Sequence, residues 1–391
     1  MSRFHVATNE EILAGKVTDA YFVRTMEILE KKNISKPVVM EIRAASFPHS
    51  WPWAVFAGLE EVQYLLEEIG KPLDLYCLDE GTLFFPGEPV GYVIGEYKDF
   101  CVYETALLGL LCQATGIATQ AARCVKAAEG RPVLSFGARR IHPALAPLVD
   151  RNAYLGGCQG YSSVIAAEKL GGEASGTMPH TLILLVGDTV EATRLFDEVI
   201  APHIPRISLI DTFQDEKFEA LRVAEGLGAH LHGIRLDTPF SRRGDFIAIL
   251  KEIRWELDLR GFQHVKIIAS GGLNEHSIAD LNPYCDGYGV GTAISNARVV
   301  DFSLDIVEMD GKPVSKRGKL SGRKRLIACG NPSIKRKIIP WMENDSERAQ
   351  DLITLKVEKG KTVVKSPAIE RIRELVLNQL EYVDFNQLAD K

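Results

Sequence analysis

The stretch VKIIASGG, residues 265–272, decides the fold. An apolar run that ends in a serine and two glycines indicates a buried strand followed by a tight turn. A second stretch of the same design, CDGYGVGT, follows at residues 285–292. Short apolar strands that alternate with amphipathic segments are typical of βα units, so these stretches predict a parallel sheet.

The same alternation extends from Arg131 to about Ala297. So many βα units in so short a segment predict a compact, irregular (β/α) barrel, which we place at residues 114–300. The alternative is a doubly wound sheet, but no GxGxxG motif opens a helix after the first strand. The expected strands are PVLSFG, GGCQG, GEASGT, RISLID, LHGIRLD, VKIIASGG and CDGYGVG, of which some are weak.

The segments on either side of the barrel have a different pattern. Residues 1–113 mix helical periodicity with strands and Gly-Pro turns, which predicts an N-terminal α+β sandwich domain. Residues 301–391 contain further strand-like runs and a terminal amphipathic helix, which predicts a C-terminal extension that packs on the N-terminal domain. The predicted fold class is therefore α/β, with the barrel as the catalytic domain.

Composition excludes several classes of protein. The chain has 391 residues and a formal net charge of −6, so nucleic acid is not an expected partner. Its seven cysteines form no CxxC pair, which favours a reducing compartment and hence the cytoplasm. Apolar runs such as TLILLVG are shorter than the ~20 residues that a membrane span needs, so we expect no membrane association.

Nearly every expected strand ends in a polar or charged side chain. The active site of a parallel barrel lies at the carboxyl ends of its strands, where the following loops converge. Each residue alone has an ordinary structural explanation, such as a salt bridge, a cap or a turn. The joint pattern favours a functional site built, in strand order, from Phe136, Arg139, Arg140, His142, Gln159, Thr177, His180, Asp211, Arg235, Asp237, Ser270, Gly271, Gly272, Gly289, Gly291 and Thr292.

The last two strand ends indicate the class of ligand. Glycine-rich turns let backbone N–H groups approach a phosphate, and Thr292 opens a helix whose dipole favours an anion. Asp211 and Asp237 are then placed to face the sugar of a phosphosugar. Arginines suit further anionic groups, because the planar guanidinium matches carboxylate and phosphate.

These stretches resemble the type II phosphoribosyltransferases, most closely the archaeal-type nicotinate phosphoribosyltransferases. The similar segments are VTDAYFVRT, SFGARR, GTMPH, IRLDTP, SGGL, DGYGVGT and KLSGRKR. The resemblance implies that nicotinate attacks phosphoribosyl pyrophosphate to form nicotinate mononucleotide and pyrophosphate. It also implies Mg²⁺ on the pyrophosphate and ribose, although the metal ligands stay unassigned, and a homodimer with a shared active site, or a higher oligomer built from it.

The resemblance also implies roles for residues around the pyridine ring. Phe136 would stack on one face of the ring, and Tyr21 of a neighbouring subunit would stack on the other. Arg139 would hold the ring carboxylate or a phosphate, and Arg235 would lie near the same pocket. Arg43 would reach the pyrophosphate across the dimer.

On the sugar side, Asp237 and Asp211 would stabilise the ribose and the cation that forms at its anomeric carbon. His180 would be either a phosphorylated histidine that couples ATP hydrolysis to synthesis or a plain pyrophosphate contact. Gln159 occupies the position where amide-selective relatives place an aspartate, which favours the acid over nicotinamide. The 5′-phosphate would bind to Ser270, Gly271, Gly272, Gly289, Gly291 and Thr292.

Two other functions stay open at this point. Quinolinate phosphoribosyltransferases share the scaffold, and GEPVGYVIGEY, residues 87–97, is similar to their N-terminal domain. Such an enzyme would also release carbon dioxide. The third hypothesis is a non-catalytic barrel that binds phosphosugars, against which the density of charged strand ends argues.

Overall fold

The computed structural model describes residues 4–329, 335–343 and 350–384. The chain forms two compact units, one of Met1–Thr119 with Arg298–Lys391 and one of Gln120–Ala297. The chain crosses between them within helix α5 (Glu104–Ala127) and again after Ala297. These crossings lie a few residues from the expected boundaries at 113/114 and 300/301, because the long helix α5 contributes to both units.

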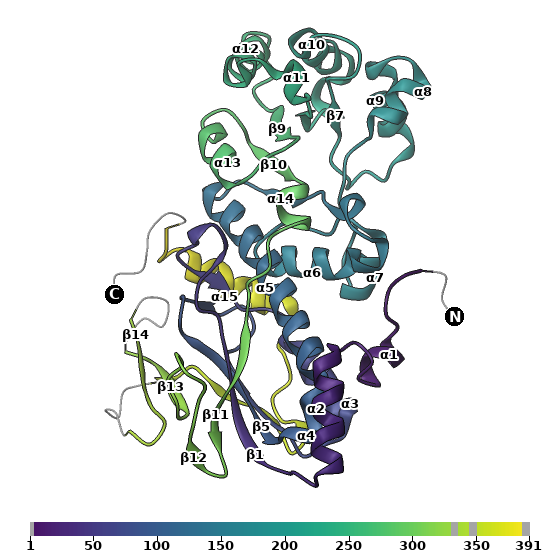
Figure 1. The fold of residues 1–391 in the computed structure, drawn as a ribbon. Helices are drawn as coiled ribbons and strands as arrows, with labels where there is room; N and C mark the ends of the chain where they lie inside the picture. Colours follow the sequence, from purple (N-terminus) through teal and green to yellow (C-terminus); the bar gives the residue numbers. More distant parts are fainter. Residues whose placement is uncertain (1–3, 330–334, 344–349, 385–391) are drawn as a thin grey trace. The chain divides into compact units, whose positions relative to one another are not determined.

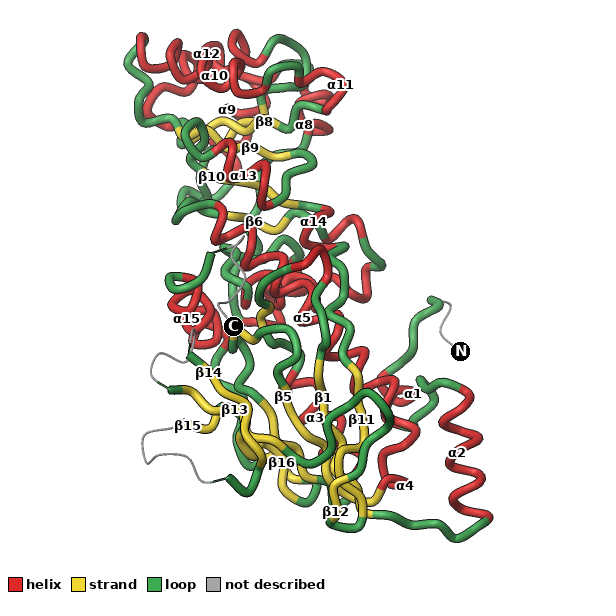
Figure 2. The backbone as a smooth tube through the Cα atoms, turned by 60° about the vertical axis from the view of Figure 1, so that its left-hand side comes forward, coloured by secondary structure: helices red, strands yellow, loops and turns green. Residues whose placement is uncertain are grey.

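The first unit is built on an antiparallel sheet to which both ends of the chain contribute. Strand β1 (Pro37–Arg43) pairs with β5 (Pro89–Glu96) on one side and with β11 (Ser303–Met309) on the other. Figures 1 and 2 show these strands side by side. The full strand order is β12 (Lys312–Pro313), β11, β1, β5, β3 (Asp74–Cys77), β16 (Thr354–Glu358) and β17 (Lys361–Thr362).

Helices and smaller sheets complete this unit. Helix α3 ends at Gly70, whose φ of +66° is the left-handed conformation that glycine adopts without strain. The remaining elements are α1 (Asn9–Leu13), α2 (Ala20–Lys31), η1 (Pro48–Ser50), β2 (Ala54–Val55), α3 (Leu59–Ile69), β4 (Leu83–Phe84), α4 (Tyr97–Phe100), η2 (Cys101–Tyr103), β13 (Lys324–Ala328), β14 (Arg336–Pro340), β15 (Gln350–Asp351) and α15 (Ile369–Leu380).

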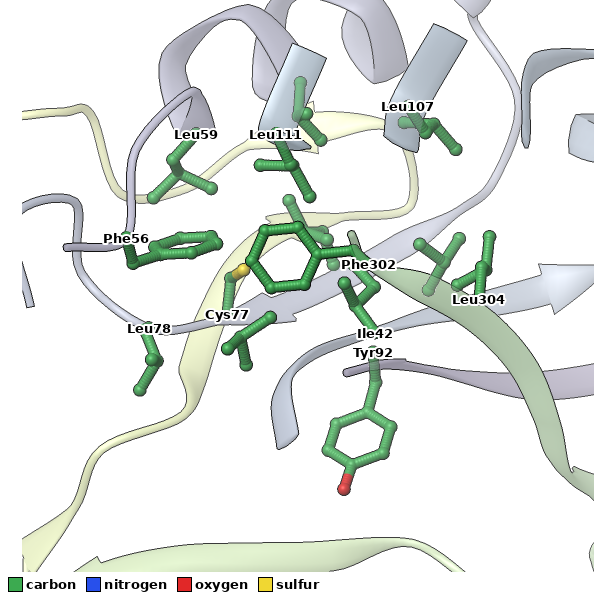
Figure 3. Close-up of a cluster of buried hydrophobic side chains, with 14 of the residues drawn as sticks. Ile42, Phe56, Leu59, Cys77, Leu78, Tyr92, Leu107, Leu111, Phe302 and Leu304 are labelled. Carbon is green, nitrogen blue, oxygen red and sulfur yellow. The ribbon is translucent and has the colours of Figure 1, made fainter. Parts of the chain in front are cut away.

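The core of the first unit joins distant parts of the chain through aromatic contacts. Phe302, just before β11, stacks on Phe84 with 5.7 Å between ring centroids and meets Phe56 edge-on at 6.4 Å. Figure 3 shows Phe302 among side chains from the N-terminal strands and from helix α5, including Leu111. Aromatic pairs of this kind add to the stabilisation from area burial alone. The core therefore includes the described C-terminal residues Val300, Phe302, Leu304, Val307, Leu326, Ile353 and Val357.

A polar network is also buried in the first unit. Lys324 Nζ donates to Glu41 Oε2 at 2.8 Å, and Tyr92 Oη donates to the same oxygen at 3.1 Å. All three side chains are nearly inaccessible to solvent. Because each charge has a partner, the network links β1, β5 and β13 without leaving an unpaired buried charge.

The longest helical run, Tyr97–Ala127, is long and apolar enough to cross a membrane by length and composition. More than half of its most apolar window is buried inside the fold, as in the core helix of a soluble protein. Its length reflects its double role, since it serves both units of the chain.

The second unit contains the expected parallel sheet. Its strand order is β6 (Val133–Ser135), β10 (Gly287–Val290), β9 (Lys266–Ser270), β8 (Gly233–Leu236) and β7 (Ile207–Leu209), and all four pairings are parallel. Figure 2 shows β6, β10, β9 and β8 following one another along the unit. Its helices are η3 (Ala138–Arg140), η4 (Pro143–Leu145), α6 (Ala146–Leu155), α7 (Val164–Leu170), α8 (His180–Val186), α9 (Thr189–Val199), α10 (Glu216–Leu227), η5 (Gly228–His230), α11 (Phe240–Arg243), α12 (Phe246–Leu259), α13 (Glu275–Leu281) and α14 (Thr292–Ser295).

Two expected strands, GGCQG and GEASGT, are not regular strands. An isolated parallel bridge joins Tyr161, just after the first stretch, to Ala174 in the second, and the backbone N–H of Gln159 donates to the carbonyl of Val133 in β6 at 2.8 Å. Both stretches are rich in glycine and lack β-branched side chains within the paired region, which weakens strand formation. The barrel is thus irregular at this point, and the remaining five strands carry the sheet.

Glu104, at the start of α5, makes the stability of the first unit depend on pH. The pKa of its carboxyl is raised from 4.5 to about 7, mainly by burial and partly by nearby Asp305, although a 2.7 Å hydrogen bond from Tyr97 Oη opposes the rise. The unfolded chain ionises this group near pH 4.5. The free energy of unfolding therefore falls as pH rises from about 4.5 through 7, by about 2–3 kcal/mol.

We expect Glu104→Gln to remove this loss, because the amide oxygen still accepts the Tyr97 bond and carries no charge. In urea unfolding, the variant should exceed the wild type by about 2 kcal/mol at pH 8 and match it near pH 5. Glu30→Gln, at an exposed glutamate of α2, is the control and should show no such pH dependence. An equal difference at both pH values would contradict the assignment.

Candidate functional site

A cavity of about 780 Å³ lies in the second unit, at the carboxyl ends of β6, β8, β9 and β10. Its position follows from the parallel pairing, which brings the loops after these strands to one edge of the sheet. The cavity is lined by most of the residues that the sequence predicts: Phe136, Arg139, Arg140, Thr177, His180, Arg235, Asp237, Ser270, Gly271, Gly272, Gly289, Gly291 and Thr292.

Five predicted residues do not line this cavity. Tyr21 and Arg43 belong to the first unit. His142 is exposed, and its Nδ1 accepts a hydrogen bond from the backbone N–H of Ala144, so it caps the short helix η4. Gln159 is exposed as well. Asp211 lies behind the cavity wall, next to His180.

Arg235 joins two walls of the cavity. Its guanidinium carbon lies 5.5 Å from the centroid of the Phe136 ring, and its Nη1 donates to Thr177 Oγ1 at 2.6 Å. Burial lowers the pKa of Arg235, while the carboxylates of Asp237 and Asp211 raise it. An arginine stays protonated in proteins, so the cavity holds a partly buried positive charge beside an aromatic face.

His180 lies between two carboxylates. Its Nε2 is 3.9 Å from Asp237 Oδ2 and 4.0 Å from Asp211 Oδ2, and its Nδ1 lies 2.9 Å from Thr212 Oγ1. The Asp211 side chain is only 3% exposed, and neither of its oxygens makes a regular hydrogen bond. Burial raises the pKa of Asp211, against the attraction of His180. A carboxylate left in this state is costly, which is typical of a functional site.

Close contacts with neighbouring side chains shape the two glycine turns, at residues 270–272 and 289–292. Gly271 and Gly272 have φ angles of +84° and +69°, which other residues adopt only with strain. Ser270 Oγ lies 2.9 Å from Asp237 Oδ1 and so ties the first turn to the carboxylate. At Gly289, a Cβ atom would lie 2.3 Å from the Phe136 ring, so only glycine lets the ring reach this position.

Ser162 is a cavity residue that the sequence reasoning missed. Its hydroxyl donates to Asp150 Oδ1 at 2.8 Å, while Ser163 donates to Oδ2 through both its backbone N–H and its hydroxyl. Asp150 is almost fully buried. The loop therefore presents Ser162 to the cavity, whereas Gln159, the residue expected to set selectivity, does not line it. The serine pair in YSS, residues 161–163, is the one sequence feature that could have indicated the position of Ser162, and serine pairs are common in loops.

Comparison with known families identifies the scaffold. The quinolinate phosphoribosyl transferase N-terminal domain matches residues 19–115, and the C-terminal domain of the same family matches residues 117–305. Nicotinate phosphoribosyltransferase pncB2 of Mycobacterium tuberculosis is 34% identical over 357 residues, which cover 82% of this chain and 75% of that protein. The chain belongs to the quinolinate and nicotinate phosphoribosyltransferase family.

Other members of the family agree with this assignment. Nicotinate phosphoribosyltransferase of Bacillus subtilis is 28% identical over 435 residues, covering 93% of this chain and 88% of that protein. Among solved structures, the nicotinate-nucleotide pyrophosphorylase of Pyrococcus furiosus is 50% identical, with a TM-score of 0.94 and coverage of 97% and 98%. Human nicotinic acid phosphoribosyltransferase, at 18% identity and a TM-score of 0.71, supports the fold alone; the alignment covers 95% of this chain and 96% of that one.

The contact between Gly289 and Phe136 predicts a local effect of added volume. Gly289→Ala should lower the free energy of unfolding by about 1–3 kcal/mol, because the aromatic ring must leave its place. Gly176→Ala is the matched control, since Gly176 lines the same cavity and a Cβ there meets nothing within 4 Å. Urea unfolding of the two variants measures the difference. Equal stability of both would show that the ring moves at no cost.

Proposed function

We propose that this chain is a nicotinate phosphoribosyltransferase, which forms nicotinate mononucleotide and pyrophosphate from nicotinate and phosphoribosyl pyrophosphate. The observation that carries the proposal is the charge of the cavity. Arg139, Arg140 and Arg235 line it together with the glycine turns, and Asp237 is the carboxylate among its described lining residues. Such a surface suits one anionic ring substituent and a phosphosugar.

The proposed reaction needs little acid–base chemistry, because the pyridine nitrogen already carries a free lone pair. Phe136 would stack on the ring, and Arg235 and Arg139 would hold its carboxylate. Asp237 would stabilise positive charge at the anomeric carbon as the pyrophosphate leaves. The turns at residues 270–272 and 289–292 would hold the 5′-phosphate. Catalysis would then come mainly from positioning and charge stabilisation.

The active site is proposed to be completed by a second subunit. Tyr21, in the amphipathic helix α2, is 57% exposed, as are Val23 at 52% and Ile28 at 58%. A homodimer would cover these side chains and bring Tyr21 to the second face of the ring. Arg43, on β1, would then reach the pyrophosphate of the neighbouring subunit.

The magnesium ion is proposed to bind with the substrate. The described residues contain no group of three or more His, Cys, Asp or Glu side chains suited to hold a metal. This fits Mg²⁺, which commonly binds through one or two carboxylates plus substrate phosphates. Asp237 and the buried, unsatisfied Asp211 are the carboxylates we assign to it, and the ion would neutralise charge on the pyrophosphate.

ATP is proposed as a co-substrate that acts through His180. The contact of His180 Nδ1 with Thr212 Oγ1 supports this role, because it orients the ring and leaves Nε2 on the side of Asp211 and Asp237. We place the protein in the cytoplasm, where its seven free cysteines would stay reduced.

A quinolinate phosphoribosyltransferase is the second candidate, because both domains of that family match the chain. A product assay separates the two. With phosphoribosyl pyrophosphate and Mg²⁺, we expect pyrophosphate release with nicotinate, little with nicotinamide, and no carbon dioxide from quinolinate. Addition of ATP should raise the yield of nicotinate mononucleotide. Carbon dioxide release from quinolinate would overturn the nicotinate assignment, and no pyrophosphate release from any pyridine acid would favour a non-catalytic phosphosugar-binding protein.

Asp237→Asn tests the sugar side of the proposed site. The amide keeps the size of the side chain and its contact with Ser270 but removes the charge. We expect kcat to fall by about 100-fold or more with little change in thermal stability, since charge stabilisation of the transition state is lost. Asp280→Asn, at an exposed position on α13, is the control. Turnover of Asp237→Asn close to that of the wild type would refute this role.

A further inference from the structure

Arg243, the last residue of the short helix α11, makes contacts that neither the sequence nor the proposed reaction explains. Its Nε donates to the backbone oxygen of Thr238 at 3.1 Å. Its Nη2 donates to the backbone oxygens of Ser270 at 3.0 Å and Gly271 at 2.8 Å. One side chain thus bridges the loop after β8, which carries Asp237, and the glycine turn after β9.

These bonds constrain the direction of the glycine turn. Because the carbonyls of Ser270 and Gly271 point toward the guanidinium, the turn cannot rotate without breaking them. The turn is closely packed on both sides, since a Cβ added at Gly271 would lie 3.0 Å from Arg243 Nη2 and 3.0 Å from Asp237 Oδ1. The turn is therefore held between a cation on one side and the Asp237 carboxylate on the other.

The guanidinium is itself anchored. It lies over the ring of Phe246, 4.4 Å from the centroid, and Phe246 is buried at the start of α12. Asp237 and Asp211 both stabilise its charge electrostatically, in opposition to the cost of partial burial. Arg243 does not belong to the described cavity lining, so it acts on the site from behind the loops.

We propose that Arg243 is a positioning residue that locks the Ser270–Gly272 turn and the Asp237 loop into one phosphosugar-binding surface. This inference rests on the proposed function, because it takes the glycine turn to hold the 5′-phosphate. The arginine does not contact the substrate. It sets the distance between the phosphate-binding turn and the carboxylate that faces the sugar.

Arg243→Lys is the sharpest variant. Lysine keeps the positive charge, but its single ammonium cannot reproduce the planar fork that donates to three carbonyls on two loops. Arg243→Ala serves as a second, more severe variant. Arg242→Lys is the matched control, because Arg242 is the neighbouring arginine and is exposed.

Steady-state kinetics with saturating nicotinate and varied phosphoribosyl pyrophosphate give the main test. For Arg243→Lys we expect KM for phosphoribosyl pyrophosphate to rise by about tenfold. In a second series, with nicotinate varied at saturating phosphoribosyl pyrophosphate, KM for nicotinate should change by less than about twofold. Arg242→Lys should stay within about twofold of the wild type for both. A merely structural arginine would lower the melting temperature of the variant and leave KM for phosphoribosyl pyrophosphate unchanged, and that result would overturn the proposal.

Isothermal titration with ribose 5-phosphate keeps this inference separate from the proposed reaction. If the wild type releases no pyrophosphate with any pyridine acid, the proposed function fails, but the titration still decides the role of Arg243. Binding about tenfold weaker in Arg243→Lys than in the wild type supports the role. Equal binding in both proteins, or no measurable binding by the wild type, overturns it. If Arg243→Ala does not fold, the lysine variant alone carries the comparison.

Discussion

The parallel pairing of β10 with both β6 and β9 is the constraint on which the site depends. It places residues 133–136 directly beside residues 287–291, although they are far apart in the chain. Phe136 can then lie against Gly289, and the two glycine turns end on the same edge of the sheet. A one-residue slip in register would move each side chain to the other face of the sheet. The Phe136 ring and both glycine turns therefore reach their positions only in this one register.

The electrostatics of the cavity follow from this geometry. Arg235 and Asp237 come from the end of β8, whereas Asp211 follows β7 and His180 opens α8. The carboxylates of Asp237 and Asp211 oppose the lowering of the Arg235 pKa by burial. Asp211 is the extreme case, since its oxygens are shielded from water without regular hydrogen bonds. Partly buried charges stabilise one another only when opposite charges lie close together. These four side chains accordingly form one compact cluster within the second unit.

Most of the predicted strand-end residues line one cavity, because parallel strands bring their carboxyl ends to one edge whatever the details of the loops. Gln159 and His142 do not line this cavity, and Ser162, which the sequence did not single out, does. These residues lie in loops, whose course is set by side-chain contacts rather than by strand pairing. Asp150, buried on α6, selects Ser162 for the cavity through bonds that leave no periodic signal. The glycine-rich stretches GGCQG and GEASGT resembled strand ends by position, yet neither forms a regular strand: the structure shows an isolated bridge at Tyr161 and Ala174 and a single backbone bond from Gln159 to Val133.

Hydrogen bonds made by three side chains explain how a site made mostly of loops is held in place. Asp150 holds the Ser162 loop, Ser270 holds Asp237, and Arg243 holds the turn at Gly271. In each case a side chain replaces the ladder of backbone hydrogen bonds that a regular element would supply. Catalysis by positioning requires that reacting groups stay within fractions of an ångström, so a site that depends on few such bonds is sensitive to each of them. Residues outside the cavity wall, such as Arg243 and Asp150, therefore fix the positions of residues that line it.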